Sequence, residues 1–194
     1  MTDRLFVAVF PPAEIIEQLE RLVAPRRDAV LDWRWTRPEN WHLTLAFFGD
    51  VSDDRQEPLM DALAEVAQSA KAFQLTVGGA GIFGKAASKA AVGLRARAVW
   101  MGAQLGGGEL AALSARVRAA SSRVGVHADG SRFTAHLTLA RAYRPSPARG
   151  LLNIVESFGD FSFTVSGFQL VKSTLAPSGS IYEPLRHFPL ANRR

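Results

Sequence analysis

Short apolar runs alternate with amphipathic segments along the chain, and this alternation predicts a mixed fold of strands and helices. The apolar runs predict strands at residues 4–10, 42–48, 73–77, 97–105, 132–143, 161–173 and 180–190. Apolar residues that recur at helical spacing predict helices at residues 11–23, 52–71, 110–124 and 146–158.

The order of these elements is similar in the two halves of the chain. Each half contains one strand with the tetrapeptide His-Leu-Thr-Leu, and helical segments flank that strand. The pattern predicts an α+β fold of two related lobes, each with a largely antiparallel sheet, flanking helices and a shared cleft between them. Because no linker rich in Pro, Gly and Ser divides the halves, we expect residues 1–194 to form a single bilobal domain.

The repeated tetrapeptide occupies residues 42–45 and 136–139 and contains two of the four histidines of the chain. In a strand, residues i and i+2 point to the same face. His42 and Thr44 therefore share one face, as do His136 and Thr138, while the leucines between them can anchor each strand to a core. If the lobes face each other, two imidazoles and two hydroxyls meet in one cleft.

That set of side chains suits the cleavage of a phosphodiester. One neutral imidazole can act as the base and one imidazolium as the acid near neutral pH, because histidine titrates in that range. Threonine hydroxyls can bind the phosphate oxygens, and neither role requires a metal ion. The alternative is that both histidines are half-buried and satisfied by neighbouring carbonyl groups.

Composition narrows the possible functions further. The absence of cysteine excludes disulfides, thiolate zinc sites and cysteine nucleophiles, and fits a reducing cytoplasm. A formal charge of +5 favours an anionic partner or has no specific meaning. No apolar run reaches 18 residues, so no membrane span is expected, and the first residues read as a strand rather than a secretion signal.

Two other types of site fit the sequence less well. The segment "GAGIFGK" matches a glycine-rich phosphate loop except that Ala86 replaces the Ser or Thr that would bind magnesium, and turns between strands explain its glycines better. The motif histidines lack the additional ligands that a zinc or iron site requires. His127 and His187 are expected to be structural or solvated.

The segments "ENWHLTLAFFG" and "FTAHLTLAR" resemble the paired signatures of the 2H phosphoesterase superfamily, and among its members the bacterial RNA 2′,3′-cyclic phosphodiesterases, also called 2′–5′ RNA ligases. The similarity extends from "RLFVAVFPP" to "YEPLRHFPL". It implies a bilobal fold and the hydrolysis of a terminal 2′,3′-cyclic phosphate on RNA to a 2′-phosphomonoester, without a cofactor. It further implies a monomeric cytoplasmic enzyme whose partner is RNA.

The same resemblance implies roles for individual residues. His42 would protonate the departing 3′-oxygen, His136 would activate water, and Thr44 and Thr138 would bind the phosphate. Arg141 would contact the phosphate as well. Strict alternation puts Arg141 on the opposite face from His136, so a bulge or the strand end has to turn it inward.

Aromatic and basic residues near the motifs are further candidates. Phe48 and Tyr182 would stack on a base or ribose, or else belong to the core. Arg34, Arg37, Arg132 and Arg144 lie close in sequence to the motif strands, where they form either a basic rim for an RNA end or an ordinary solvated surface.

Three other functions remain open at this point. The first is the reverse reaction, which joins RNA ends through a 2′–5′ linkage. The second is binding of RNA or nucleotide phosphate without turnover. The third is hydrolysis of a small cyclic nucleotide such as ADP-ribose 1″,2″-cyclic phosphate.

Overall fold

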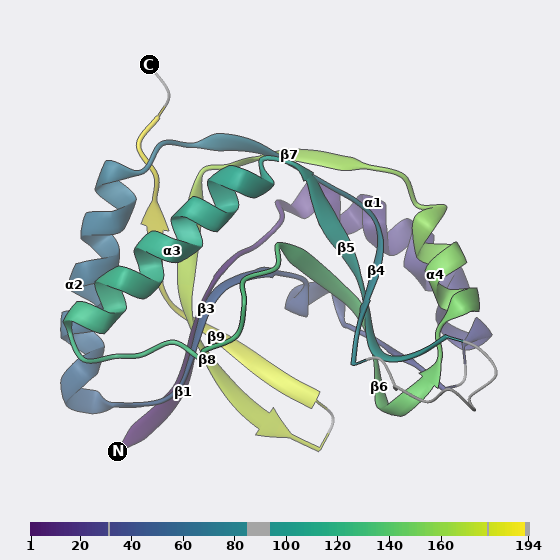
Figure 1. The fold of residues 1–194 in the computed structure, drawn as a ribbon, viewed down its shortest axis with the longest axis horizontal. Helices are drawn as coiled ribbons and strands as arrows, with labels where there is room; N and C mark the ends of the chain where they lie inside the picture. Colours follow the sequence, from purple (N-terminus) through teal and green to yellow (C-terminus); the bar gives the residue numbers. More distant parts are fainter. Residues whose placement is uncertain (31, 85–93, 178, 193–194) are drawn as a thin grey trace.

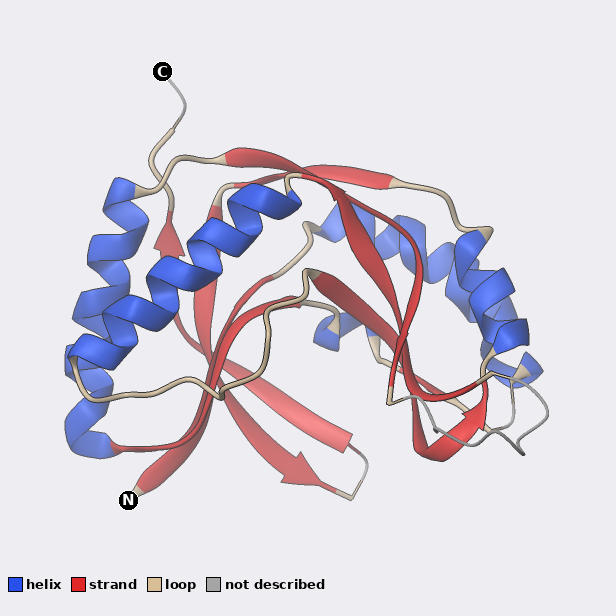
Figure 2. Cartoon of the chain, in the orientation of Figure 1, coloured by secondary structure: helices blue, strands red, loops and turns tan. Residues whose placement is uncertain are grey.

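The computed structural model describes residues 1–30, 32–84, 94–177 and 179–192. These residues form the α+β fold that the sequence predicts, with four α-helices and an antiparallel sheet (Figures 1 and 2). The strands are β1 (Thr2–Val9), β2 (Arg34–Trp35), β3 (Leu43–Ser52), β4 (Phe73–Phe83), β5 (Arg95–Leu105), β6 (His136–Pro147), β7 (Phe161–Val165), β8 (Gly167–Ala176) and β9 (Gly179–Pro189). The helices are α1 (Ala13–Val23), α2 (Asp53–Ser69), α3 (Gly107–Arg123) and α4 (Arg149–Glu156), with short 3-10 helices η1 (Ala24–Ala29) and η2 (Pro38–Asn40).

The strands form one continuous, curled sheet in the order β7-β4-β5-β6-β3-β1-β8-β9, and β2 pairs with β6 outside this path. The two motif strands, β3 and β6, are neighbours at the centre of the sheet. They are antiparallel and in register at Leu43 and Leu137. This pairing joins two halves of four strands each, and each half contributes one motif.

The helices cover the two halves separately. Helices α2 and α3 pack on each other and on β3, whereas α4 packs on β4 and β5 (Figure 1). Helix α1 follows Pro11 and Pro12 and buries Ile15, Leu19 and Val23, which recur every four residues. One hydrophobic core extends through both halves. None of the helices in the described ranges is long and apolar enough to cross a membrane.

The predicted strand at 161–173 is wrong, because the structure divides it into two strands. The break falls at Ser166, between β7 and β8. Strand β7 pairs with β4, whereas β8 pairs with β1 on the other side of the sheet. The chain therefore changes partner at Ser166. A continuous apolar run does not reveal such a change, because both pieces have strand character.

The expectation that the glycines of "GAGIFGK" form turns is wrong for Gly79 and Gly81, which lie within β4. Gly81 faces Trp100 on the neighbouring strand β5, and a Cβ at this position would overlap the indole ring. Glycine is thus required by close packing there. Lys85 and Ala86, the end of the segment compared with a phosphate loop, lie outside the described residues.

We predict that Leu43→Ala destabilises the protein by about 2–5 kcal/mol, because it opens a cavity where the two halves meet. Leu43 is 1% exposed, so its side chain is fully enclosed. The free energy of unfolding in urea measures the change. Leu105→Ala is the matched control: Leu105 is 60% exposed, and its replacement should change stability by less than about 0.5 kcal/mol. Equal effects of the two substitutions would contradict this prediction.

Candidate active site

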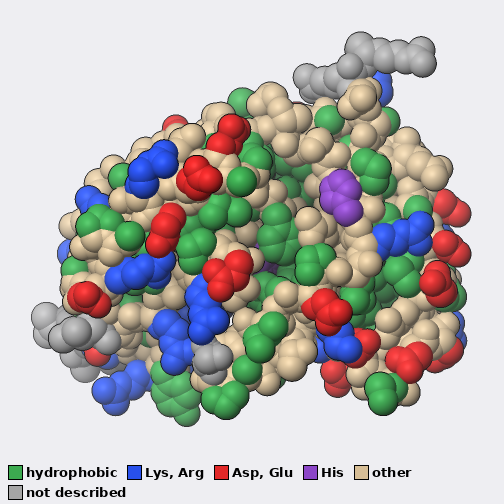
Figure 3. All heavy atoms as spheres, turned by 180° about the vertical axis from the view of Figure 1, so that it is seen from behind, with side chains coloured by type: hydrophobic (Ala, Val, Ile, Leu, Met, Phe, Trp, Pro, Cys, Tyr) green, Lys and Arg blue, Asp and Glu red, His purple; other side chains and the backbone are tan. Residues whose placement is uncertain are grey.

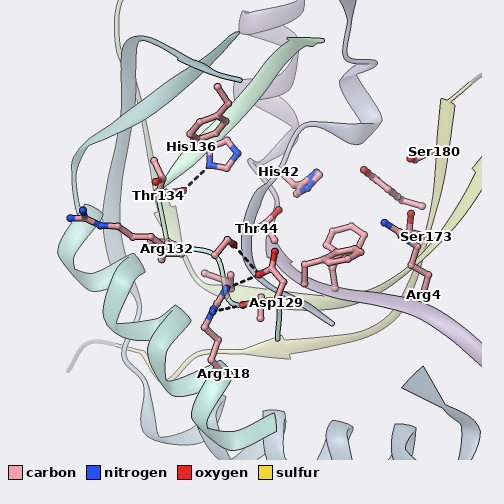
Figure 4. Close-up of a pocket in the computed structure, with 18 of the residues that line it drawn as sticks. Arg4, His42, Thr44, Arg118, Asp129, Arg132, Thr134, His136, Ser173 and Ser180 are labelled. Atoms are coloured by element: carbon pink, nitrogen blue, oxygen red, sulfur yellow. Dashed lines mark hydrogen bonds and ion pairs between the residues drawn. The ribbon is translucent and has the colours of Figure 1, made fainter. Parts of the chain in front are cut away.

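The two motif histidines line the same cleft, which has a volume of about 470 Å³. Residues from β1, β3, β6, β8 and β9 form its walls, together with the segment that precedes β6 and with one residue each from β4 and α3. Figure 4 shows His42 and His136 on opposite sides of this cleft, with Thr44 between them. The sequence predicts that two imidazoles and two hydroxyls meet in one cleft; the structure brings both imidazoles and the hydroxyl of Thr44 there, but not that of Thr138.

The pairing of β3 with β6 explains this convergence. Leu43 and Leu137 are opposite each other, and Leu43, Leu45, Leu137 and Leu139 are all buried in the core, as the sequence predicts. The residues that flank the paired leucines must therefore point to the other face of the sheet. One antiparallel step brings Thr44 towards His136 and His42 towards Thr138. Thr138 is 9% exposed and, unlike Thr44, is not among the residues that line the cleft.

Both imidazoles are held by a main-chain carbonyl two residues earlier. His42 Nδ1 lies 2.7 Å from the carbonyl oxygen of Asn40, and His136 Nδ1 lies 2.7 Å from that of Thr134. A carbonyl oxygen can only accept a hydrogen bond, so each Nδ1 carries a proton and donates it. The other ring nitrogen, Nε2, has no hydrogen-bond partner among the described residues. The contact with a carbonyl therefore orients each ring and leaves one nitrogen of each free for proton transfer.

Aromatic rings surround both histidines. The rings of Phe6, Phe10 and Tyr182 lie with their centroids 5.0, 5.7 and 5.4 Å from that of His42. Phe83 lies edge-on to His136 at 4.7 Å, and Trp100, which occupies the space above Gly81, lies at 5.9 Å. These rings shield part of each imidazole from water and lower the local dielectric.

This environment lowers the pKa of both histidines. Burial lowers the pKa of His42 from 6.5 to about 4; the hydrogen bond to Asn40 opposes the change, and the charges of Arg141 and His136 add to it. Burial is also the main cause that lowers the pKa of His136, and Arg141 contributes again. In the free protein both imidazoles are thus neutral at pH 7. A nearby anion acts in the opposite direction, because it favours the charged ring.

A β-bulge turns Arg141 into the cleft. Val99 on β5 is opposite Ala140, but the next residue, Trp100, is opposite Thr138, so Leu139 is an extra residue on β6. The extra residue reverses the alternation beyond it. Arg141 consequently lines the cleft on the same face as His136, by the kind of irregularity that the sequence analysis requires.

A second bulge has the same position in the other motif strand. Ala8 is opposite Thr44 and Val7 is opposite Ala46, so Leu45 is an extra residue on β3. Beyond it Phe47 lines the cleft, whereas Phe48 packs against the main core. The structure therefore does not bring Phe48 to the cleft.

Phe47 takes the position five residues after His42 that Arg141 takes after His136. The Phe47 ring makes a cation–π contact with Arg4, whose guanidinium carbon lies 4.7 Å from the ring centroid. Tyr182, the other predicted stacking residue, does line the cleft.

Several cleft residues have no counterpart in the sequence prediction. Arg4 and Phe6 line the cleft from β1. They are two residues apart and share a face of the strand, but the unbroken buried run that begins at Leu5 gives no sign of which face meets the cleft. Arg118 comes from α3 and binds Asp129, with Nη2 at 3.0 Å from the carboxylate and Nη1 at 2.9 Å from the carbonyl (Figure 4). Nothing local in the sequence relates these two residues to the motif strands.

The cleft is rich in arginine. Arg4, Arg118, Arg132 and Arg141 line it together with one carboxylate, that of Asp129. Over the face shown in Figure 3, by contrast, Lys and Arg side chains alternate with Asp and Glu side chains. The arrangement favours an anionic ligand in the cleft.

The remaining predicted residues lie elsewhere. His127 and His187 are exposed and do not line the cleft, and His127 Nδ1 lies 3.2 Å from the hydroxyl of Ser122. Within the described residues, no group of three or more His, Cys, Asp or Glu side chains could hold a metal ion.

Comparisons with known proteins relate this site to one family. The LigT-like phosphoesterase family matches residues 9–92 and 105–182. A protein of Archaeoglobus fulgidus named RNA 2′,3′-cyclic phosphodiesterase is 32% identical over 95% of this chain and 99% of its own length. The protein of the same name from Escherichia coli is 30% identical over 97% of both chains.

Solved structures agree with the sequence comparison. The protein TT0787 of Thermus thermophilus superposes with a TM-score of 0.76 at 25% identity, covering 98% of this chain and 100% of that one. Escherichia coli LigT complexed with 3′-AMP superposes with a TM-score of 0.73 at 28% identity, covering 98% and 99%. The chain with the repeated His-Leu-Thr-Leu motif therefore belongs to the LigT-like phosphoesterase family of the 2H superfamily.

Proposed function

We propose that this chain, acting as one domain, hydrolyses the terminal 2′,3′-cyclic phosphate of RNA to a 2′-phosphomonoester without a metal ion. The observation that carries the proposal is the placement of two imidazoles across one arginine-lined cleft, each with Nδ1 bound to a carbonyl and Nε2 free. Such a pair can take a proton on one side of a phosphorus atom and give one on the other. The names of the relatives supply the substrate.

The proposed reaction is an in-line displacement at phosphorus. Nε2 of His136 accepts a proton from water, and the water oxygen forms a bond to phosphorus. The bond from phosphorus to the 3′-oxygen breaks, and Nε2–H of His42 gives that oxygen its proton. Thr44 and Arg141, which line the cleft, bind the non-bridging oxygens. The product has a 2′-phosphate and a 3′-hydroxyl, and a proton passes from His136 to His42 through solvent to complete the cycle.

The assignment of His42 as the acid depends on substrate binding. Its pKa of about 4 in the free protein leaves roughly one molecule in a thousand protonated at pH 7. A phosphodiester anion in the buried cleft favours the imidazolium, because the pair of opposite charges replaces an isolated buried charge. His136 needs no such help, since its lowered pKa already keeps it neutral and ready to accept a proton.

The same cleft suits the joining of RNA ends, in which the 5′-hydroxyl of a second RNA takes the place of the attacking water. Binding without turnover is the alternative from another functional class. Substitution of the histidines distinguishes catalysis from binding. Replacing an imidazole that only binds phosphate changes the affinity for the ligand, whereas replacing one that transfers a proton lowers the rate of turnover.

We predict that His42→Ala and His136→Ala each lower the turnover of a short RNA ending in a 2′,3′-cyclic phosphate by about a hundredfold or more, because each removes one proton-transfer group. Product analysis in the presence of EDTA measures the loss and identifies the phosphate position. His127→Ala is the control, because His127 is exposed and does not line the cleft. Its activity should stay within twofold. A 3′-phosphate product, loss of activity in EDTA, or unchanged turnover in the two motif variants would each refute the corresponding part of the proposal.

We predict that kcat/KM has a bell-shaped pH profile whose alkaline limb lies below pH 6.5. The reaction needs one proton on the pair of histidines, and both have lowered pKa values in the free protein, to about 4 for His42. The active fraction rises as the pH increases through about 4 and is lost as the second proton leaves below pH 6.5. The kcat profile should extend to higher pH, because bound phosphate raises the pKa of His42. Initial rates between pH 3.5 and 9 test this, and coincident profiles with an alkaline limb above pH 7 would contradict it.

A further inference from the structure

A second cavity of about 850 Å³ adjoins the catalytic cleft. The two cavities share Arg141, Ser180 and Tyr182 in their walls, so they lie directly beside each other. We call the second cavity the side groove. Its walls are the segment from Asp32 to Arg37 with β2, the stretch of β6 that follows Arg141, and the beginning of β9.

The side groove has a rigid floor. Trp33 and Trp35 line it and are 8% and 6% exposed. The indole nitrogen of Trp33 donates to the carbonyl of Pro147 at 2.9 Å, and that of Trp35 donates to the carbonyl of Arg26 at 3.3 Å. Asn40 links the side groove to the catalytic cleft. The side-chain amide of Asn40 donates to the carbonyl of Ser180 at 3.0 Å, and the main-chain carbonyl of Asn40 accepts the hydrogen bond from His42. The walls are thus fixed relative to the catalytic histidine.

The charge of the side groove is predominantly positive. Arg34, Arg37 and Arg141 line it, against the single carboxylate of Asp32. Arg37 is exposed, and no described residue forms a hydrogen bond or ion pair with its side chain. Its guanidinium contributes little to the fold and remains available to a ligand, and a planar guanidinium suits a phosphate.

An aromatic ring stands beside these arginines without any packing role. Tyr143 follows Arg141 by two residues on β6, lines the side groove and is 100% exposed. A fully solvated aromatic side chain on a strand gains nothing from burial in the protein itself. Such a ring offers a face on which a nucleobase can stack, whatever the base.

We propose that the side groove binds the nucleotides on the 5′ side of the terminal cyclic phosphate, with Arg37 on a backbone phosphate and Tyr143 stacked on a base. This inference rests on the proposed function, which puts the cyclic phosphate between His42 and His136. An RNA that leaves the catalytic cleft past Arg141 and Tyr182 enters the side groove directly. The substrate class is therefore an oligonucleotide, with little dependence on base.

The test compares two substrates with the same terminal nucleotide: a nucleoside 2′,3′-cyclic phosphate and a tetranucleotide that ends in it. For the unmodified protein, kcat/KM should be at least about tenfold higher for the tetranucleotide. Tyr143→Ala and Arg37→Ala should each remove about five- to tenfold of that advantage, while turnover of the mononucleotide stays within twofold. Tyr143→Phe keeps the ring and should keep the advantage.

The salt dependence and a charge-matched variant complete the experiment. Arg37→Ala should reduce the slope of log kcat/KM against log salt concentration by about 0.7 for the tetranucleotide, as loss of one phosphate contact requires for a single strand. Arg123→Ala removes the same charge from an exposed position in the last turn of α3, which lines neither cavity, and should not change the ratio between the substrates.

The outcomes distinguish the groove from the chemistry. Equal kcat/KM for the two substrates, or variants that lower both rates equally, would overturn the side groove while the phosphodiesterase stands. If neither substrate is hydrolysed, the proposed function fails. Fluorescence anisotropy with the labelled tetranucleotide then tests whether the side groove binds RNA. Binding that Tyr143→Ala weakens about tenfold supports a single-strand RNA site, and unchanged binding rejects it.

Discussion

The antiparallel pairing of Leu43 with Leu137 is the contact on which the geometry of the site depends. It joins the two halves of the sheet, and both side chains are buried in the common core. The flanking residues must therefore leave by the opposite face, where His42 and His136 meet the cleft. A slip of one residue would turn these imidazoles into the core and expose the leucines. Hydrophobic burial of the leucines thus determines where the two motif histidines lie, independently of any contact that the imidazoles make.

The parts of the site that follow from strand periodicity could be predicted from the sequence. Alternation places His42, Thr44 and His136 on one face because nothing interrupts the strands between each histidine and the threonine two residues later. The four helices could also be predicted from the sequence, because their apolar residues recur every three to four positions, whereas a strand repeats every two. Arg141 could be expected in the cleft only by requiring an irregularity whose position alternation does not specify.

What the sequence could not reveal depends on pairing between distant segments. The bulges at Leu45 and Leu139 exist only relative to β1 and β5, and the first of them exchanges Phe48 for Phe47 in the cleft. The break at Ser166 likewise reflects a change of partner strand. Arg118 and the carboxylate of Asp129 reach the cleft from α3 and the segment that follows it, so only the tertiary fold relates them to the histidines.

The rings of His42 and His136 both take their orientation from the main chain, through the carbonyl groups of Asn40 and Thr134. Every amino acid carries that carbonyl, so exchange of the side chain at either position leaves the acceptor in place. The residues at positions 40 and 134 can therefore change during evolution while the tautomer of each imidazole stays the same. A contact that orients both imidazoles can therefore be inherited without a conserved side chain, and comparison of sequences alone would not detect it.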